Sequence, residues 1–314
     1  MKLIEPSVNL INDPNPLKKI EIAGRTCYKS DSEYTNESSI KFYRAMSDRR
    51  HYAMLEHGNL TFKISGLKEG QLDSSLLSIP YLIYSYVDNN YLITISCSHI
   101  SRLDDIICDS MSEVAKSILH DMRHLFYIYY ILDSNERVGV NWIEGHGIKV
   151  TLITDINDII DLGPDIFKQH AHLTFKFICD RGVSHELVRH RCSVAQESQR
   201  YCNYSKDKFG NEITFIIPYN FEKWPEEAQW AFKRSLEYSE RKYLELIEHN
   251  MPPEKARGVL PNATKTEVIL TMPIAQWVHF INLRSVGSTG KPHPDMKILA
   301  DQVATKVNAI INLT

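Results

Sequence analysis

Alternating apolar and polar positions mark several short segments that we predict to be β-strands. The clearest are Leu60–Ile64 and Leu173–Ile178, which share the order Thr-Phe-Lys and place every second side chain on one face. The other predicted strands are Tyr91–Ser96, Gly145–Thr154 and Asn211–Ile217. These strands are few and short, so they predict a modest sheet.

Apolar residues spaced three and four apart predict longer helices. Pro225–Asn250 is the clearest, because Phe232, Leu236, Tyr243 and Ile247 form one stripe among charged residues. The other predicted helices are Ser38–Arg50, Asp109–Leu132, a short one starting at Pro253, Pro273–Val286 and Pro294–Leu313. Residues 4–29 are predicted as a strand and loop, because prolines interrupt them. The pattern predicts an α+β fold with long helices around the sheet.

The two Thr-Phe-Lys strands suggest how the chain is organised. Residues 66–165 lie between them as an apparent elaboration, and no Gly/Ser-rich linker sets this segment apart. We therefore expect a single domain over residues 1–314 that carries an insertion at 66–165.

Composition narrows the class of protein. The chain has 314 residues, a net charge of −3 and 43% hydrophobic residues, which is typical of a folded globular protein. Its six cysteines form no Cys-x-x-Cys pair, a usage that suits a reducing compartment. No run approaches the ~20 apolar residues of a membrane helix, and no signal peptide is evident. We expect a cytoplasmic protein that does not bind a membrane.

One basic segment stands out against this acidic background. Residues 181–208 contain six cations and three acids, which leaves a local charge of +3. Arginine side chains grip phosphates and carboxylates in two places, so Arg189-His-Arg191 predicts an anion site. The following residues, 196–205, are mostly short polar side chains, which suit an oriented polar ligand better than a solvated surface.

Two other interpretations compete with this one. Arginines interleaved with aromatic residues can bind nucleic acid, but the basic run is short and the rest of the chain is acidic. We therefore expect no nucleic-acid partner. His170-x-His172 with His185 and His190 could serve a metal hydrolase, but no carboxylate or cysteine is spaced as an obvious third ligand. We expect no metal site.

The basic segment also carries a family resemblance. Asp180 to Arg191, followed by Gln196-Glu-Ser-Gln-Arg-Tyr201, resembles the signature of the flavin-dependent thymidylate synthases. Three further stretches are similar to family elements in the same order: Arg25–Ser30, His51–Phe62 and Ala256–Arg284. The resemblance covers most of the chain except residues 66–165.

This resemblance implies a fold like that of the thymidylate synthase complementing proteins, and a reaction. dUMP is converted to dTMP, methylenetetrahydrofolate donates the carbon, and FAD reduced by NADPH supplies the hydride. The resemblance also implies a homotetramer with shared active sites. The lack of a Gly-x-Gly-x-x-Gly fingerprint agrees with it, since the family holds FAD without a Rossmann fold.

The resemblance assigns site residues by position. Arg284 and Ser198 take the catalytic positions, Arg284 beside the uracil. The positions that bind dUMP are Glu186, Arg189, Gln196, Glu197, Ser198, Gln199, Arg200, Arg257 and Arg284. The positions that bind FAD are His51, Ala53, Arg189, His190, Arg191, Gln196, His279 and His293. A fixed guanidinium stabilises the anion formed when uracil loses its N3 proton, which agrees with the place of Arg284.

The chain departs from the family pattern in three places, one of which is Gly290–Met296, where the family often has Ala-Gln-x-Glu. The spacer between Arg191 and Ser198 is one residue shorter than usual, and Pro273-Ile-Ala275 replaces the family's Asn-x-Arg. These departures leave a second hypothesis open, a divergent relative that binds flavin or nucleotide but does not transfer the methyl group.

Overall fold

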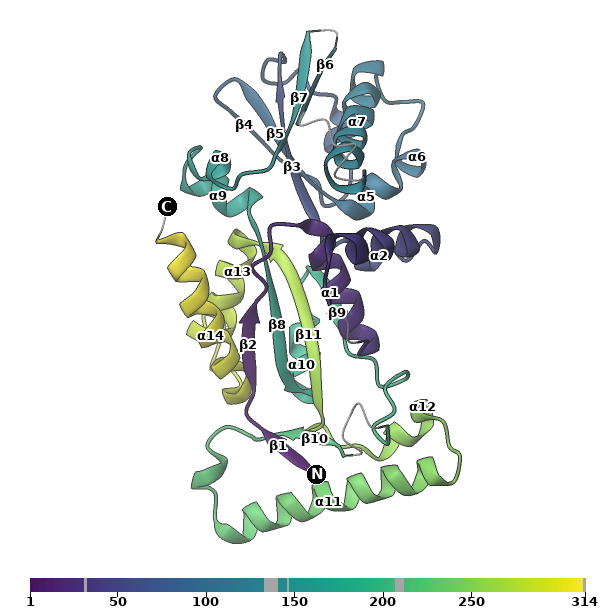
Figure 1. Cartoon of the computed structure of the whole chain (residues 1–314). Helices are drawn as coiled ribbons and strands as arrows, with labels where there is room; N and C mark the ends of the chain where they lie inside the picture. The colour runs from purple at the N-terminus through teal and green to yellow at the C-terminus, as the bar shows by residue number, and fades with distance from the viewer. Residues whose placement is uncertain (31–32, 133–140, 146, 207–211, 313–314) are drawn as a thin grey trace.

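The computed structural model describes residues 1–30, 33–132, 141–145, 147–206 and 212–312. Its strands form three sheets, of four, five and two strands, which lie one above the other in Figure 1 with helices packed against them. The predicted α+β class is confirmed. The ends of the strand predicted at 211–217 and of the helix predicted at 294–313 fall outside the described residues.

The four-stranded sheet lies in the middle of the molecule. Its order is β2 (Ser7–Leu10), β8 (His172–Asp180), β11 (Lys265–Pro273) and β9 (Ser193–Gln196), with all neighbours antiparallel. Helices α13 (Ile274–Ile281) and α14 (Pro294–Ile311) lie along one side of this sheet (Figure 1). Trp277 fills the core between them, fully buried against Phe175 and Phe280.

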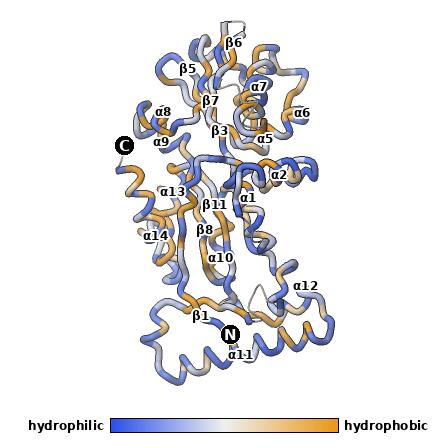
Figure 2. The backbone as a smooth tube through the Cα atoms, viewed as in Figure 1, coloured by the Kyte–Doolittle hydropathy of each residue, from blue (hydrophilic) through white to orange (hydrophobic). Residues whose placement is uncertain are grey.

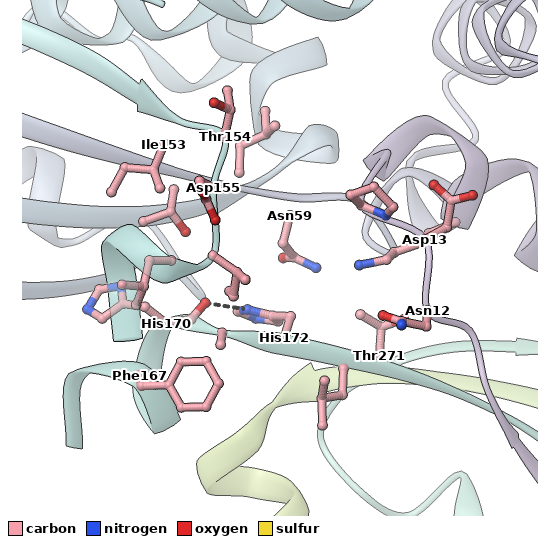
Figure 3. A pocket seen from close by; sticks show the side chains of 18 of the residues that line it. Asn12, Asp13, Asn59, Ile153, Thr154, Asp155, Phe167, His170, His172 and Thr271 are labelled. Carbon is pink, nitrogen blue, oxygen red and sulfur yellow. Dashed lines mark hydrogen bonds between the residues drawn. The ribbon is translucent and has the colours of Figure 1, made fainter. Parts of the chain in front are cut away.

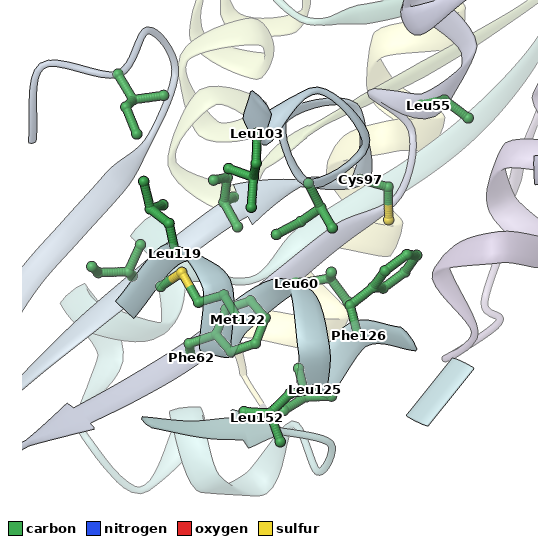
Figure 4. Packing of buried hydrophobic residues seen from close by; sticks show 14 of the residues in the cluster. Leu55, Leu60, Phe62, Cys97, Leu103, Leu119, Met122, Leu125, Phe126 and Leu152 are labelled. Carbon is green, nitrogen blue, oxygen red and sulfur yellow. The ribbon is translucent and has the colours of Figure 1, made fainter. Parts of the chain in front are cut away.

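The five-stranded sheet lies above it. Its order is β4 (Ile83–Val87), β5 (Asn90–Ser96), β3 (Asn59–Ser65), β7 (Ile148–Ile153) and β6 (Trp142–Gly145). Helix α7 (Glu113–Phe126) packs its buried leucine, methionine and phenylalanine side chains onto this sheet (Figure 4). Residues 66–165 thus supply four of its five strands, and their status as an insertion stays a prediction.

At the lower end of the molecule, β1 (Lys2–Ile4) pairs in parallel with β10 (Thr214–Ile216). The long helix α11 (Glu226–Glu248) runs beneath this pair (Figure 1). Its only buried side chains are Leu236 and Tyr243, and hydrophilic residues dominate along it in Figure 2.

The remaining elements are short, apart from α1 and α2. They are α1 (Pro16–Tyr28), α2 (Asn36–Asp48), α3 (Tyr52–Leu55), α4 (Ser74–Leu77), α5 (Cys97–Ser101), α6 (Leu103–Ile106), η1 (Tyr127–Ile131), α8 (Asn157–Ile160), α9 (Pro164–His170), α10 (Arg181–Leu187), η3 (Phe221–Lys223), α12 (Pro253–Ala256), η4 (Arg257–Val259) and η5 (Asn282–Val286). No helix among the described residues is long and apolar enough to cross a membrane.

One sequence prediction is wrong. Residues 4–29 were predicted as a strand and loop, but 16–28 form helix α1. The reason is local: Asn15 accepts a hydrogen bond from the Leu17 N–H, and Pro16 takes the first helical position, where its missing N–H costs nothing. Leu17, Ile20 and Ala23 then bury one face completely.

A single apolar core joins the upper and middle sheets. It contains Leu17 and Ile20 of α1, Phe62 of β3, Phe126 of α7 and Ile269 of β11. The two sheets are therefore packed together through α1.

Candidate functional site

Helix α10 begins the predicted anion site. Asp180 caps it by accepting a hydrogen bond from the Val183 N–H at 2.8 Å. The helix places Glu186 on its last turn, half-buried, and the chain then passes through the Arg-His-Arg triplet into β9. β9 pairs with β11, which fixes the residues that follow it.

Four predicted site residues meet at one point. Arg284 Nη1 donates to Glu186 Oε2 at 2.6 Å, and its Nε–H donates to His190 Nε2 at 3.3 Å. His293 Nδ1 lies 3.2 Å from Glu186 Oε1, and its Nε2 lies 3.4 Å from Asp295 Oδ2. Residues of α10 and the triplet thus meet residues of η5 and the start of α14. The two groups are about a hundred positions apart in sequence.

His190 is held neutral in this cluster. Burial, together with the nearby Arg284 and His279, lowers the pKa of His190 to about 4. Because Nε2 accepts from Arg284, the remaining proton is on Nδ1. The ring also packs on Phe280, with 4.9 Å between centroids. His279 is exposed on α13 and close enough to act on His190, so it joins the same cluster.

The second group of predicted residues follows β9. The Gln196 amide donates to Ser184 Oγ at 2.9 Å, and the Ser198 N–H donates to the Cys27 carbonyl at 3.0 Å. The side chains of Glu197 and Gln199 point inward and are buried, whereas Ser198 is half-buried and Arg200 is exposed. Buried side chains that anchor this segment therefore alternate with side chains that face outward.

A buried charge network anchors this segment from below. Lys265 donates to Glu197 at 2.9 Å and to Glu267 at 2.5 Å. Lys29 and Lys176 also pair with Glu267. Burial raises the pKa of Glu267, but the three lysines outweigh it and bring that pKa to about 2. The Glu267 carboxylate thus stays ionised, and its lysine partners hold it in place.

This network was missed by the sequence analysis. Lys29 lies within the Arg25–Ser30 element, but its function was not considered. Lys265 and Glu267 lie on a strand whose other residues are all buried. Two charged residues at alternate positions of an otherwise buried strand are the signal that could have found it, since buried charges require partners.

Three of the arginines predicted to bind ligand face solvent and have no acidic partner among the described residues. Arg189, Arg191 and Arg200 are exposed, and none makes an ion pair with any described residue. Arg200 lies over the Tyr201 ring at 5.3 Å. Unpaired guanidinium groups on one short segment suit a ligand with more than one phosphate. Lys208, which was counted with this segment, lies outside the described residues.

The other predicted residues lie apart from these groups. Arg257 is in η4, where its Nε–H donates to the Glu254 carbonyl at 3.3 Å. His51 precedes α3 and Ala53 is exposed on it. Helix α3 borders β9, since Ser193 Oγ donates to the Glu56 carbonyl at 3.0 Å. Within the described part of the chain, no contact joins Arg257, His51 or Ala53 to the Arg284 cluster.

The metal-site alternative does not fit the geometry. Both ring nitrogens of His170 are hydrogen-bonded, Nδ1 to Thr94 and Nε2 to Ser85. His172 Nδ1 donates to the His170 carbonyl at 3.0 Å. Over the residues that the structure describes, no three His, Cys, Asp or Glu side chains are grouped to hold a metal ion.

The unpaired arginines of the basic segment suit a flavin dinucleotide. A flavin dinucleotide carries a pyrophosphate, which needs cationic donors that are not already paired with carboxylates. Arg189 and Arg191 satisfy this condition. His279 is also exposed, and it lies near enough to His190 to lower the pKa of that histidine. The residues present therefore fit the group.

The chain is similar in sequence to flavin-dependent thymidylate synthases of several organisms. The chain is 34% identical to a flavin-dependent thymidylate synthase of Pyrococcus furiosus over 154 residues, covering 48% of this chain and 58% of that protein. It is 34% identical over 131 residues to one of Geobacter sulfurreducens, covering 41% and 54%. The chain thus spans just over half the length of these curated relatives.

One of the solved structures that the chain matches is the UMP/dUMP methylase PolB from Streptomyces cacaoi bound with 5-Br dUMP. It shares 15% identity and a TM-score of 0.40, and the match covers 98% of this chain and 91% of that one. The family model of the thymidylate synthase complementing proteins matches residues 136–311. Because that match covers more than half of the 314 residues, the chain belongs to the thymidylate synthase complementing protein family.

Proposed function

We propose that the protein is a flavin-dependent thymidylate synthase that converts dUMP to dTMP. The single observation that carries the proposal is the Arg284 cluster, in which a guanidinium is fixed by Glu186 and neutral His190. The names of the relatives support it, since several are flavin-dependent thymidylate synthases.

The chain's own residues bind and orient the nucleotide in this proposal. Arg200 and Arg257 hold the phosphate of dUMP, and both lack an acidic partner among the described residues. Gln196, Ser198 and Arg189 orient the base and sugar. Glu197 and Gln199 are buried, so their part is to fix the loop from within, not to contact solvent-borne nucleotide.

Arg284 then acts on the uracil ring. When N3 loses its proton, negative charge spreads over the ring oxygens, and a preorganised guanidinium stabilises that charge. Electron density at C5 rises, which prepares that carbon for methylation. Arginine itself stays protonated, so it acts as an electrostatic partner and not as a base. Ser198 takes a supporting place beside the reacting ring.

Arg189, His190 and Arg191 would hold FAD, with His51, Ala53, Gln196, His279 and His293 around it. Bound flavin, reduced by NADPH, supplies the hydride, and methylenetetrahydrofolate supplies the carbon.

We also propose that residues 66–165 are an elaboration of a single domain, and that the enzyme is a cytoplasmic homotetramer. Exposed aromatic residues on α11, Trp230 and Tyr238, support an association through that helix.

Purified protein with bound flavin tests the proposal. We expect flavin absorbance, and release of tritium from [5-³H]dUMP when NADPH and methylenetetrahydrofolate are added. Flavin binding without tritium release indicates the second hypothesis, a relative that has lost methyl transfer. A protein that binds neither flavin nor dUMP contradicts both.

A further inference from the structure

A cleft of about 790 Å³ separates the upper and middle sheets (Figure 3). It is lined by the turn after β2, the start of β3, the segment 153–160 and the start of β8. None of the residues proposed for nucleotide or flavin lines it. The cleft is therefore a second site, separate from the Arg284 cluster.

Its size and position suit a small organic ligand. Binding pockets typically occupy ~300–1,000 Å³ and are common where two structural units meet. Much of the wall is apolar and comes from the segments on either side of the cleft. The apolar lining includes Ile153, Ile156, Ile160, Phe167 and Leu173. Such a wall accepts an aromatic or aliphatic body.

The two acids in the lining are already satisfied by neighbours. Asp13 Oδ2 lies 3.6 Å from Lys18 Nζ, and Asp13 Oδ1 accepts from the Asn15 N–H at 2.9 Å. Asp155 Oδ1 accepts from the backbone and side-chain amides of Asn157, each at 2.9 Å. Neither carboxylate is committed to the cleft.

Lys19 is the exception. It lines the cleft, and its ammonium group has no hydrogen bond and no ion pair within 4.0 Å to any described residue. Burial lowers the pKa of Lys19, and Asp13 offsets only part of this effect. A half-buried cation that no carboxylate pairs with directly is costly, and an anion in the cleft lowers that cost.

Hydrogen-bonding groups stand beside this cation. Asn12 lines the cleft. Asn59 projects into the cleft in Figure 3, and its side-chain amide donates a long hydrogen bond of 3.4 Å to the Glu56 carbonyl. His172 donates its Nδ1 proton to the His170 carbonyl, so its Nε2 presents a lone pair. Among its polar groups, the cleft thus offers the Lys19 cation, the Asn12 and Asn59 amides and an acceptor on His172.

We propose that this cleft binds a small organic anion, with its acidic head group at Lys19 and the Asn12 and Asn59 amides. Its apolar body lies along the wall of Ile153, Ile160 and Phe167. A carboxylate and a phosphate monoester share this head-group chemistry, and the experiment separates them.

Isothermal titration of the full chain with 4-phenylbutyrate, phenyl phosphate and the uncharged 4-phenylbutanol tests the proposal. We expect at least one anion to bind and the alcohol to bind at least about tenfold more weakly, since a charge-assisted contact is lost. The stronger of the two anions identifies the head group.

Two lysine variants locate the site. Lys19→Met should weaken anion binding by about tenfold, and Lys63→Met, which changes an exposed lysine of β3 outside the cleft lining, should not. Asn59→Ala provides a second variant if Lys19→Met fails to fold. Equal binding by Lys19→Met and the unaltered chain, or no anion binding up to about 10 mM, overturns the proposal.

Discussion

The guanidinium of Arg284 and the carboxylate of Glu186 are joined at 2.6 Å, each with roughly a quarter of its side chain exposed. A charge-assisted contact this short in a half-buried place fixes the direction of the guanidinium plane. Any anion that forms in front of Arg284 therefore meets a donor that is already oriented. The first two predictions follow from this pair.

Arg284→Ala should remove that donor. We expect tritium release from [5-³H]dUMP to fall by ~10²–10³-fold, the usual effect of losing one donor to a developing anion. Flavin absorbance should largely survive, because Arg189 and Arg191 remain. Arg241→Ala, which changes an exposed arginine on α11, is the matched control. A fully active Arg284→Ala enzyme shows that the assignment of this residue is wrong.

Glu186→Ala should leave Arg284 and His293 without the carboxylate between them. We expect kcat to fall about tenfold or more, because a freely moving guanidinium is no longer preorganised. Glu186→Gln keeps an oxygen that can accept from Arg284 and should recover part of the rate. If Gln and Ala are equally impaired, the charge of Glu186 matters and not its placement of Arg284.

The buried lysine–glutamate network should make stability depend on acid pH. The pKa of Glu267 is about 2 in the folded chain, below its usual value near 4.5. Its stabilisation is therefore complete above about pH 4.5 and is lost as the pH falls toward 2.

Glu267→Gln should lower the unfolding free energy at pH 7 by ~3–5 kcal/mol, since it leaves buried lysines without their partner. Urea denaturation measures this, with the exposed Glu237→Gln as control. The gap between Glu267→Gln and the unaltered chain should narrow as the pH falls toward 2. A gap that stays constant over that range contradicts the network's proposed role.

Buried histidines should make folding stability depend on pH in a higher range than Glu267 does. Burial lowers the pKa of His57, His170 and His172 to about 4, against about 6.5 in an unfolded chain. The unfolded state thus binds more protons between pH 6.5 and 4, so stability is full above pH 6.5 and falls across this window. Urea denaturation at pH 7.5 and 5 should show the loss. His57→Gln should make it smaller, and the exposed His249→Gln should leave it unchanged.

Glycine substitutions should rank by backbone geometry. Gly66 has φ of +96°, and an added Cβ would lie 2.1 Å from the Gly147 carbonyl oxygen. Gly66→Ala should therefore cost more than the ~1–2 kcal/mol of a left-handed residue alone. Gly70, with φ of +78° and open space, should show only that cost, and Gly145→Ala should lie within about ±0.5 kcal/mol of zero. Thermal melts of the three variants give the order.

Local patterns predicted much of this fold because their physical causes are local. The strands at β3, β5 and β8 and the helices α7 and α11 follow from side-chain periodicity. Helix α1 was missed because the prolines at 14 and 16 were interpreted as interruptions, although Pro16 starts the helix. Prolines mark both boundaries and beginnings, and only the cap decides between them.

The site was predictable where a motif names consecutive residues and unpredictable where tertiary packing joins them. Glu186, His190, Arg284 and His293 were each named from sequence, but the contacts that unite them join α10 and the triplet to η5 and the start of α14, which only the fold brings together. The lysine network and the Lys19 cleft depend on which strands are neighbours, which periodicity does not determine.

The strand order has a consequence for how the chain forms during synthesis. β2 pairs with β8, placing Leu10 opposite Phe175, and the Val8 N–H donates to the Gln302 side chain 294 positions later. The opening segment must therefore wait, unpaired, until β8 has emerged, and its contact with Gln302 forms only near the end of synthesis. Contacts of such long range slow folding and leave strand edges exposed in the interval. We expect a slow refolder whose nascent chains depend on chaperones, with yields that improve when translation is slowed at low temperature.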